Sequence, residues 1–137
     1  MAADTMKSLD GIGSGTLPDQ GIDSESATDI DLGIDLGTTR TVVARADRGN
    51  YPVISFTDEH GDEHDFIPSL TALHEGVLIH GFAARQAAHQ GAPLLRSLKR
   101  VLASPTLTAS TPVRLGDQTF SVLEVLTSFL RHLEDEL

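Results

Sequence analysis

The chain has 137 residues, a formal net charge of −10 and no cysteine. This length suffices for one small domain with a sizeable core, and the lack of cysteine excludes disulfides and thiolate metal sites. The acidic balance argues against nucleic acid and anionic membranes as general partners, and no apolar run is long enough to span a bilayer. The N-terminus lacks a basic region followed by an apolar core, so we expect a cytoplasmic protein without a signal peptide.

The first segment, residues 1–28, is rich in Gly, Ser, Asp and Thr and contains few large apolar side chains. Such a segment cannot bury enough surface to offset the entropy of ordering. We therefore expect an acidic, Gly/Ser-rich, disordered tail, followed by a folded part at residues 29–137.

The folded part is expected to begin with a hairpin over residues 30–44. Apolar side chains alternate in its first strand, which is the period-two pattern of β-structure. A β-branched run at residues 41–44 follows after a short turn that contains glycine, and this combination is typical of a hairpin. The alternating apolar residues are Ile30, Leu32, Ile34 and Leu36.

The turn of this hairpin carries groups suited to a phosphate. Gly37 lets the backbone approach a bulky ligand, and Thr38 and Thr39 add hydroxyls beside successive backbone N–H groups. The Asp35 carboxylate would repel a phosphate unless a cation lay between them, and Mg²⁺ takes one or two carboxylates together with phosphate oxygens. Spacing alone leaves two interpretations open: a phosphate-binding hairpin with Asp35 holding hydrated Mg²⁺, and an ordinary hairpin with an edge aspartate.

Two further β-segments are expected next. Residues 51–56 form a third strand, and residues 58–65 are dense in Asp, Glu and His. A hairpin tip with solvated charges is favoured there over a metal site at His60 and His64, because Gly61 between them is typical of a turn.

The middle of the chain is expected to continue with short strands and helices. Residues 68–73 and 77–79 are predicted strands joined by a turn, and a helix is predicted from Phe82 to about Gln90, before a Gly-Ala-Pro stop. An apolar pattern of helical period follows over residues 94–102. We assign no role to four histidines that are scattered along the chain: His74, His80, His89 and His132.

The last part is expected to be a hairpin followed by the clearest helix. Residues 113–120 form the hairpin, and Ser121 with Glu124 matches a capping box at the helix start. An apolar stripe runs along this helix and indicates core packing. The stripe residues are Val122, Leu126, Phe129, Leu130, Leu133 and Leu137.

A basic island stands out in this acidic chain. Residues 76–116 contain no Asp or Glu. The island either attracts an anion locally or is a solvated surface that is basic by chance. Its basic residues are Arg85, Arg96, Lys99, Arg100 and Arg114.

Four segments, in order, resemble the seventy-kilodalton heat-shock chaperones (DnaK-like proteins) of the actin-like ATPase superfamily. Residues 33–39 (GIDLGTT) are similar to the first phosphate loop of that family. Residues 66–69 (FIPS) resemble its Thr-Pro-Ser region, and residues 80–87 (HGFAARQA) resemble its Gly-x-x-Ala helix start. Residues 98–102 (LKRVL) resemble its Val-Lys-Arg-Leu-Ile segment. The resemblance covers roughly residues 31–137.

This resemblance implies an α/β fold, namely the first-lobe fragment of an actin-like (ribonuclease H-like) ATPase with an antiparallel strand meander and packed helices. It implies ATP and Mg²⁺ as cofactors, with Asp35 at the metal. It also implies that Lys99 points into the nucleotide cleft and acts in hydrolysis, where an ammonium stabilises developing charge. The residues that the resemblance assigns to cofactor binding are Asp35, Gly37, Thr38, Thr39 and Arg40, although Arg40 stands where the family often has Tyr or Asn.

The family also implies partners: nucleotide, unfolded peptides, a J-domain co-chaperone and a nucleotide exchange factor. Its second lobe, with a second phosphate loop and the adenosine pocket, is not visible in this sequence, so we expect a truncated nucleotide-binding domain. Because orientation and water exclusion need both walls of a cleft, we expect weak nucleotide binding and no robust ATP turnover by this chain alone.

Two other classes of function stay open. The first is a fragment of a sugar or glycerol kinase of the same superfamily, since Asp-x-Gly-Thr-Thr hairpins also occur there; residues 68–69 and 98–100 argue against it. The second is a short, non-catalytic interaction module, which an exposed apolar patch would favour.

Overall fold

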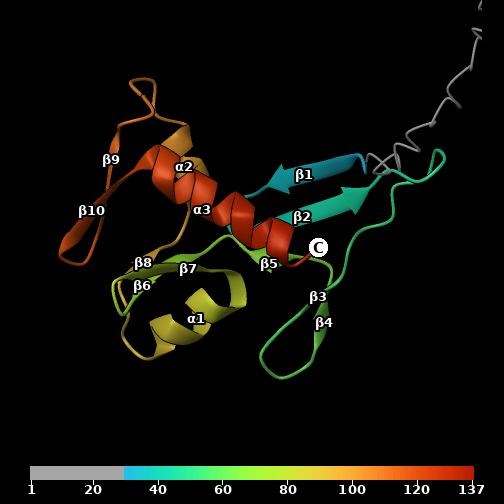
Figure 1. The fold of residues 1–137 in the computed structure, drawn as a ribbon, viewed down its shortest axis with the longest axis horizontal. Helices are drawn as coiled ribbons and strands as arrows, with labels where there is room; N and C mark the ends of the chain where they lie inside the picture. The colour runs from blue at the N-terminus through green and yellow to red at the C-terminus, as the bar shows by residue number, and fades with distance from the viewer. Residues whose placement is uncertain (1–29) are drawn as a thin grey trace, which may run out of the picture.

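The computed structural model describes residues 30–137, so the tail expected at residues 1–28 lies outside the described residues. The described part combines antiparallel sheets with three helices (Figure 1), which confirms the expected α/β class. Its strands are β1 (Leu32–Leu36), β2 (Arg40–Arg45), β3 (Phe56–Thr57), β4 (Glu63–His64), β5 (Ile67–Pro68), β6 (Thr71–His74), β7 (Val77–His80), β8 (Leu94–Leu95), β9 (Pro112–Leu115) and β10 (Gln118–Ser121). Its helices are α1 (Gly81–His89), α2 (Leu98–Leu102) and α3 (Val122–Asp135).

The first sheet has the strand order β1–β2–β5, and all its neighbouring strands are antiparallel. β1 and β2 pair along the whole length of β1. The Gly37 N–H donates to the Arg40 carbonyl (3.0 Å) and closes a turn whose tip is Thr38 and Thr39. The hairpin expected over residues 30–44 is therefore confirmed.

The strand expected over residues 51–56 is wrong in its extent. Val53 forms an isolated β-bridge with Ala44, and the Pro52 carbonyl accepts a hydrogen bond from the Arg45 N–H (3.0 Å), but a regular strand begins only at Phe56. Pro52 has no N–H, so this segment cannot donate to the ladder at that position. The chain leaves the sheet after this short contact and pairs again as the antiparallel strands β3 and β4.

The acidic turn between β3 and β4 is the hairpin expected at residues 58–65, but its charges are less solvated than expected. The Asp58 side chain is only 5% exposed and lies 2.9 Å from the His64 ring. The Arg85 guanidinium of α1 lies 3.5 Å from the same carboxylate, whereas His60 stays exposed. The hydrogen bond from His64 lowers the pKa of Asp58 to about 2. This carboxylate therefore ties the hairpin to α1.

β7 and α1 confirm the strand expected at residues 77–79 and the helix expected from about residue 82. The strand expected at residues 68–73 is wrong in its first part, because Pro68 belongs to β5, which pairs with β2, and β6 begins only at Thr71. The turn between β6 and β7 contains two residues with positive φ, Glu75 (+50°) and Gly76 (+77°). α1 packs against β5, β6 and β7 and covers one side of this part of the molecule.

The helix expected over residues 94–102 is wrong in its first part. Leu94–Leu95 is the strand β8, which pairs with β6 in a sheet of order β7–β6–β8. α2 begins only at Leu98, where the Ser97 hydroxyl accepts a hydrogen bond from the Arg100 N–H (3.3 Å). This N-cap gives α2 a defined start and separates the leucine-rich segment into a strand and a short helix.

β9 and β10 form the expected hairpin, and α3 follows directly. The Ser121 hydroxyl accepts from the Glu124 N–H (3.1 Å), and the Glu124 carboxylate accepts from the Ser121 N–H (2.6 Å). The predicted capping box is thus confirmed, and it satisfies two backbone donors at the helix start. From there α3 runs toward the sheet of β1 and β2 (Figure 1).

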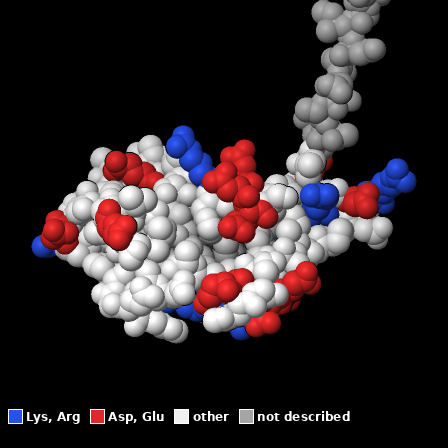
Figure 2. All heavy atoms as spheres, turned by 60° about the horizontal axis from the view of Figure 1, so that its bottom comes forward, with Lys and Arg blue, Asp and Glu red and all other residues white. Residues whose placement is uncertain are grey.

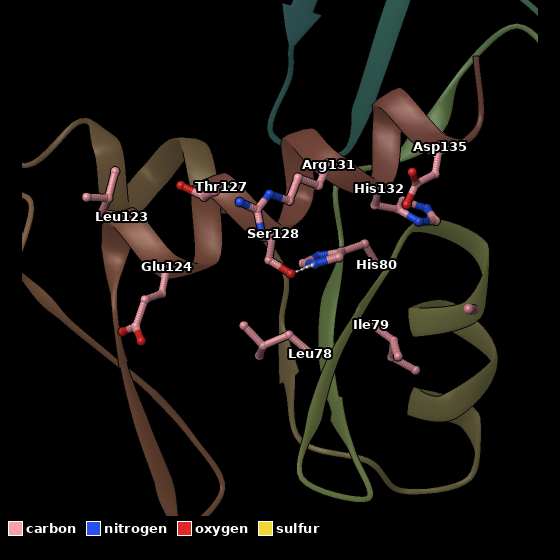
Figure 3. A pocket seen from close by; sticks show the side chains of 11 residues that line it. Leu78, Ile79, His80, Leu123, Glu124, Thr127, Ser128, Arg131, His132 and Asp135 are labelled. Carbon is pink, nitrogen blue, oxygen red and sulfur yellow. Dashed lines mark hydrogen bonds between the residues drawn. The ribbon is translucent and has the colours of Figure 1, made fainter.

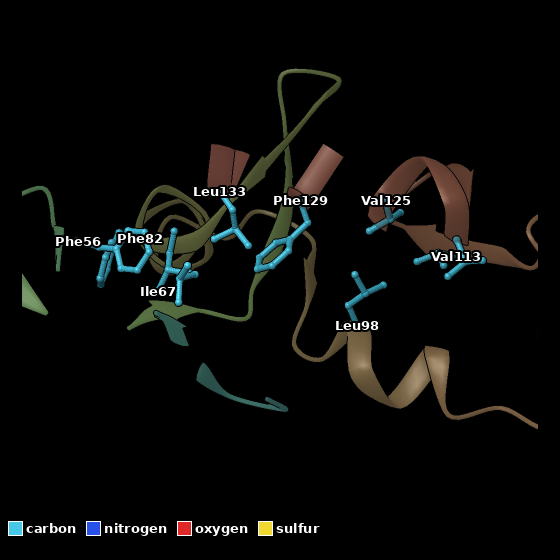
Figure 4. Close-up of a cluster of buried hydrophobic side chains, with 10 residues drawn as sticks. Phe56, Ile67, Phe82, Leu98, Val113, Val125, Phe129 and Leu133 are labelled. Atoms are coloured by element: carbon cyan, nitrogen blue, oxygen red, sulfur yellow. The ribbon is translucent and has the colours of Figure 1, made fainter. Parts of the chain in front are cut away.

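The main core lies along the inner face of α3 (Figure 4). Val125 is fully buried, and Phe129 and Leu133 are each 1% exposed. They belong to one cluster with Ile67 of β5, which joins the helix to the first sheet. The predicted stripe is wrong at Leu130 and at Leu137, which are each 42% exposed; Leu130 lies on the outer side of α3, and Leu137 lies beyond its end.

Candidate functional site

The tip of the β1–β2 hairpin is the first element of the candidate site. Thr38 and Thr39 are both exposed there. A Cβ added at Gly37 would collide with the backbone carbonyl oxygen of Arg40, so the turn itself requires glycine at this position. The Thr39 carbonyl accepts a hydrogen bond from the Ser69 N–H (2.9 Å), which anchors the turn to the segment after β5.

A pocket of about 260 Å³ opens between this turn and the start of α2. Three hydroxyl side chains and two guanidinium groups line it, with one apolar side chain and no carboxylate. Hydroxyls and guanidinium groups donate hydrogen bonds, and arginine can bind phosphate oxygens in a bidentate manner. The chemistry of the pocket therefore suits an anion of phosphate type. Its lining residues are Thr38, Thr39, Leu70, Arg96, Ser97 and Arg100.

The charge of this pocket contrasts with the rest of the chain. Figure 2 shows acidic side chains in several separate places on one face, in keeping with the net charge of −10. Arg96 and Arg100 belong to the basic island at residues 76–116, and both are exposed. A local basic site can attract an anion even in an acidic protein, because nearby charges dominate the field there.

The structure brings only part of the predicted site together. Thr38 and Thr39 line the pocket, whereas Asp35 and Lys99 are exposed residues outside its lining. The Arg40 guanidinium lies 4.4 Å from the centre of the Phe66 ring, in a cation–π contact. The sequence-based prediction missed Arg96, Ser97 and Arg100, and the basic island was the signal that could have indicated the two arginines.

The donor set suits Mg²⁺ only in a hydrated form. Among residues 30–137, no group of three or more His, Asp and Glu side chains gathers as a metal site. Hydrated Mg²⁺ needs only one or two carboxylates beside phosphate oxygens and water. Asp35, at the end of β1 and close in sequence to the turn, can supply one such carboxylate.

A second and larger pocket, of about 650 Å³, lies between β7 and α3 (Figure 3). His80 lines it and is only 4% exposed. Its Nε2 lies 2.7 Å from the Ser128 hydroxyl, and its Nδ1 lies 2.9 Å from the Thr71 hydroxyl. The His132 ring centre is 5.7 Å away. The structure thus brings together two histidines that received no role from the sequence, since they lie 52 positions apart along the chain.

The distances around His80 match those of a base beside a serine nucleophile, but the hydrogen-bond pattern does not favour activation. Thr71 is 2% exposed, and among the described residues its hydroxyl has Nδ1 as its hydrogen-bond partner. Thr71 therefore satisfies its own buried proton by donating to Nδ1, which leaves the Nε2–H to donate to Ser128. In this tautomer the ring cannot accept the Ser128 proton, so we assign the network a structural role.

The environment of His80 indicates that the fold loses stability in acid. Burial, assisted by the nearby His132, lowers the pKa of His80 from 6.5 to about 4. The unfolded state therefore binds more protons between these pH values, and stability is lost as the pH falls from about 6.5 to about 4. The expected loss of unfolding free energy is about 3 kcal/mol. Urea denaturation at a series of pH values measures it.

The matched variants for this measurement are His80→Gln and His89→Gln, the latter at an exposed histidine of α1. The His80 variant should lose the part of the pH dependence that His80 contributes and keep the part from His132, whose pKa is also lowered by burial. The His89 variant should keep both parts. An NMR titration of the His80 ring in the unaltered protein gives a second test. A ring that becomes protonated near pH 6.5 would contradict the prediction.

Comparison of the chain with protein-family models and with curated proteins finds no match. No helix within residues 30–137 combines the length and apolar character needed to cross a membrane. The resemblance to the heat-shock chaperones therefore stays a prediction.

Proposed function

We propose that this chain is the phosphate-binding part of a chaperone-type ATPase of the actin-like superfamily. The observation that carries the proposal is the pocket shared by the hairpin tip, with Thr38 and Thr39, and by Arg96 and Arg100 near α2. The turn was identified from its sequence. The two arginines lie almost 60 positions further along the chain, and the fold places them beside the turn. An anion-binding set built from distant segments supports the proposal more strongly than the turn motif alone.

In this proposal the residues of the pocket have distinct tasks. The hydroxyls of Thr38 and Thr39 and the backbone N–H groups of the turn hold phosphate oxygens. Arg96 and Arg100 balance the phosphate charge. Mg²⁺, when bound, neutralises charge on the nucleotide, and Asp35 would hold it through its water shell. For Lys99 we retain the role in hydrolysis that the resemblance implies.

In this proposal the described residues form one wall of the site, and the second lobe of the family would form the other. A phosphate bound on one wall keeps much of its water, so affinity is weak and hydrolysis by this chain alone is not expected. On this proposal the protein works in the cytoplasm with the partners of the family, namely unfolded peptides, a J-domain co-chaperone and a nucleotide exchange factor.

The test compares Mg-ATP and pyrophosphate binding by isothermal titration calorimetry in the full chain and in the double variant Arg96→Gln, Arg100→Gln. Both arginines are exposed, so the fold should be kept. Removal of two charge-assisted contacts should weaken binding at least about tenfold, since each contributes about 1.5–3 kcal/mol in a well-formed site.

The matched control is Arg114→Gln, an exposed arginine of the same basic island that does not line the pocket. It should leave the affinity within about twofold, since a distant surface charge is screened by salt. Equal weakening by the control and by the double variant would show diffuse attraction to the basic island and would contradict a defined pocket.

A further inference from the structure

The pocket between the hairpin tip and α2 carries positive charge that no carboxylate of the described residues offsets. Arg96 and Arg100 line this pocket, and within residues 30–137 neither of them forms a salt bridge. Arg85 of the same basic island, by contrast, lies 3.5 Å from the Asp58 carboxylate and 3.7 Å from that of Glu59. A guanidinium stays protonated at every ordinary pH, so the pocket keeps two positive charges without a partner among the described residues.

The pocket also holds hydrogen-bond donors without an acceptor. The N–H groups of Thr38 and Thr39 donate to no backbone carbonyl within the described residues. Ser97 is only 8% exposed, and its hydroxyl accepts from the Arg100 N–H (3.3 Å), whereas its own proton has no acceptor among residues 30–137. Buried polar groups are normally paired, so an anion in the pocket would provide the acceptors that these donors lack.

The size and lining of the pocket indicate which part of a ligand it holds. Its volume of about 260 Å³ is below the roughly 300–1,000 Å³ of sites that enclose a whole small molecule. It therefore suits a phosphate chain better than a complete nucleotide. No carboxylate lines it, and Asp35 lies outside its lining. Because Mg²⁺ binds proteins mainly through carboxylates, the wall of this pocket offers donors for an anion but no ligand of that kind for the metal.

We propose that this pocket binds a diphosphate group without Mg²⁺, and that the charges of Arg96 and Arg100 take the place of the charge of the metal. This inference rests on the phosphate-binding function proposed above and states how the charge of the ligand is balanced. Two guanidinium groups carry the same total charge as one Mg²⁺ ion, and each can bind phosphate oxygens through two parallel hydrogen bonds. The role of Asp35 and Mg²⁺ then concerns hydrolysis rather than capture of the phosphate.

The metal should weaken capture by this pocket. A diphosphate that carries Mg²⁺ has less negative charge left for the two arginines, and the metal occupies some of the oxygens that would accept their hydrogen bonds. Metal-free pyrophosphate should therefore bind about two- to tenfold more tightly than its Mg²⁺ complex, the range expected for the loss of one hydrogen bond.

The experiment is isothermal titration calorimetry of the full chain with inorganic pyrophosphate and with ADP, each in excess EDTA and in excess MgCl₂. Ionic strength is kept equal, since salt screens the attraction between exposed charges. Both anions carry the diphosphate group, so both should bind in EDTA, and neither should bind more tightly in MgCl₂. Binding of ADP without binding of pyrophosphate would overturn the inference, because the diphosphate would then not be the group that the pocket recognises.

The double variant Arg96→Gln, Arg100→Gln tests the source of the charge. It should weaken metal-free binding at least about tenfold and should weaken binding of the Mg²⁺ complex less, since the metal itself then neutralises the phosphate. Both side chains are exposed, so the fold should be kept, and circular dichroism checks it. Arg114→Gln, outside the pocket, is the control and should keep the preference for the metal-free anion.

The results separate this inference from the function on which it rests. Tighter binding in MgCl₂ than in EDTA by the unaltered chain would overturn the inference and leave the proposed function standing. A double variant that binds metal-free pyrophosphate as tightly as the unaltered chain would show that Arg96 and Arg100 do not provide the charge, and would also overturn it. No binding of either anion under either condition would contradict the proposed function itself.

Discussion

Replacement of Phe129 by alanine is expected to lower the free energy of unfolding by about 3–5 kcal/mol, the usual cost of removing a buried aromatic ring. Phe129 is 1% exposed in the centre of α3 and makes an edge-on contact with the His80 ring (5.6 Å between centres). Figure 4 shows its ring between the side chains of Ile67 and Leu98. Loss of this ring leaves a cavity in the main core beneath α3.

Leu130→Ala is the matched control, because Leu130 is the next residue of the same helix and is 42% exposed. Its substitution should change the free energy of unfolding by less than about 1 kcal/mol. Chemical denaturation of both variants, followed by circular dichroism, measures the difference. Similar losses for Phe129→Ala and Leu130→Ala would contradict the assignment of the buried face of α3.

Replacement of Gly81 by alanine is expected to lower the free energy of unfolding by roughly 2–5 kcal/mol, since overpacking and backbone strain each cost about 1–3 kcal/mol. Gly81 begins α1 with a φ of +63°. An added Cβ would lie 2.7 Å from two carbons of the Ile67 side chain and 3.1 Å from Nε2 of His132. Ile67 is itself buried in the main core, so it has little room to move.

Two glycine controls separate the causes of this loss. Gly91→Ala introduces backbone strain alone, since Gly91 has a φ of +91° and open space around its Cβ position. Gly33→Ala introduces neither effect. Thermal unfolding should rank the variants with Gly81→Ala least stable, Gly91→Ala intermediate and Gly33→Ala close to the unaltered protein. A Gly81 variant as stable as the Gly91 variant would contradict the close packing against Ile67.

Local sequence patterns predicted the elements whose causes are local. The hairpin at residues 30–44 follows from alternation and a short turn, and the start of α3 follows from Ser121 and Glu124, whose reciprocal hydrogen bonds lie within one helical turn. These signals depend on residues close in sequence, so they can be interpreted without knowledge of the tertiary structure.

The errors arose where distant partners decide the structure. Leu94 and Leu95 fit a helical period, but pairing with β6 draws them into a sheet. The alternating residues of β1 predicted a strand correctly, yet Ile34 is 45% exposed because no described element covers that part of the sheet. His80 and Ser128 lie 48 positions apart in sequence, and no local pattern indicates their contact.

The residues of the candidate site also divide into those that a local pattern indicates and those that only the tertiary fold brings together. The turn at Thr38 and Thr39 carries a recognisable local motif, so it was predicted from the sequence. Arg96 and Arg100 belong to the site through the tertiary fold, and the sequence showed only that they lie in a basic island. Lys99 was chosen by resemblance, and it lies outside the lining of the pocket.

The most direct test of the proposed function is an NMR titration of the ¹⁵N-labelled full chain with Mg-ATP. We expect the backbone signals of Thr38, Thr39 and Arg100 to shift together with a single dissociation constant, and pyrophosphate to shift the same signals. Shifts confined to the larger pocket around His80, or no shifts at millimolar nucleotide, would contradict phosphate binding between the hairpin tip and α2.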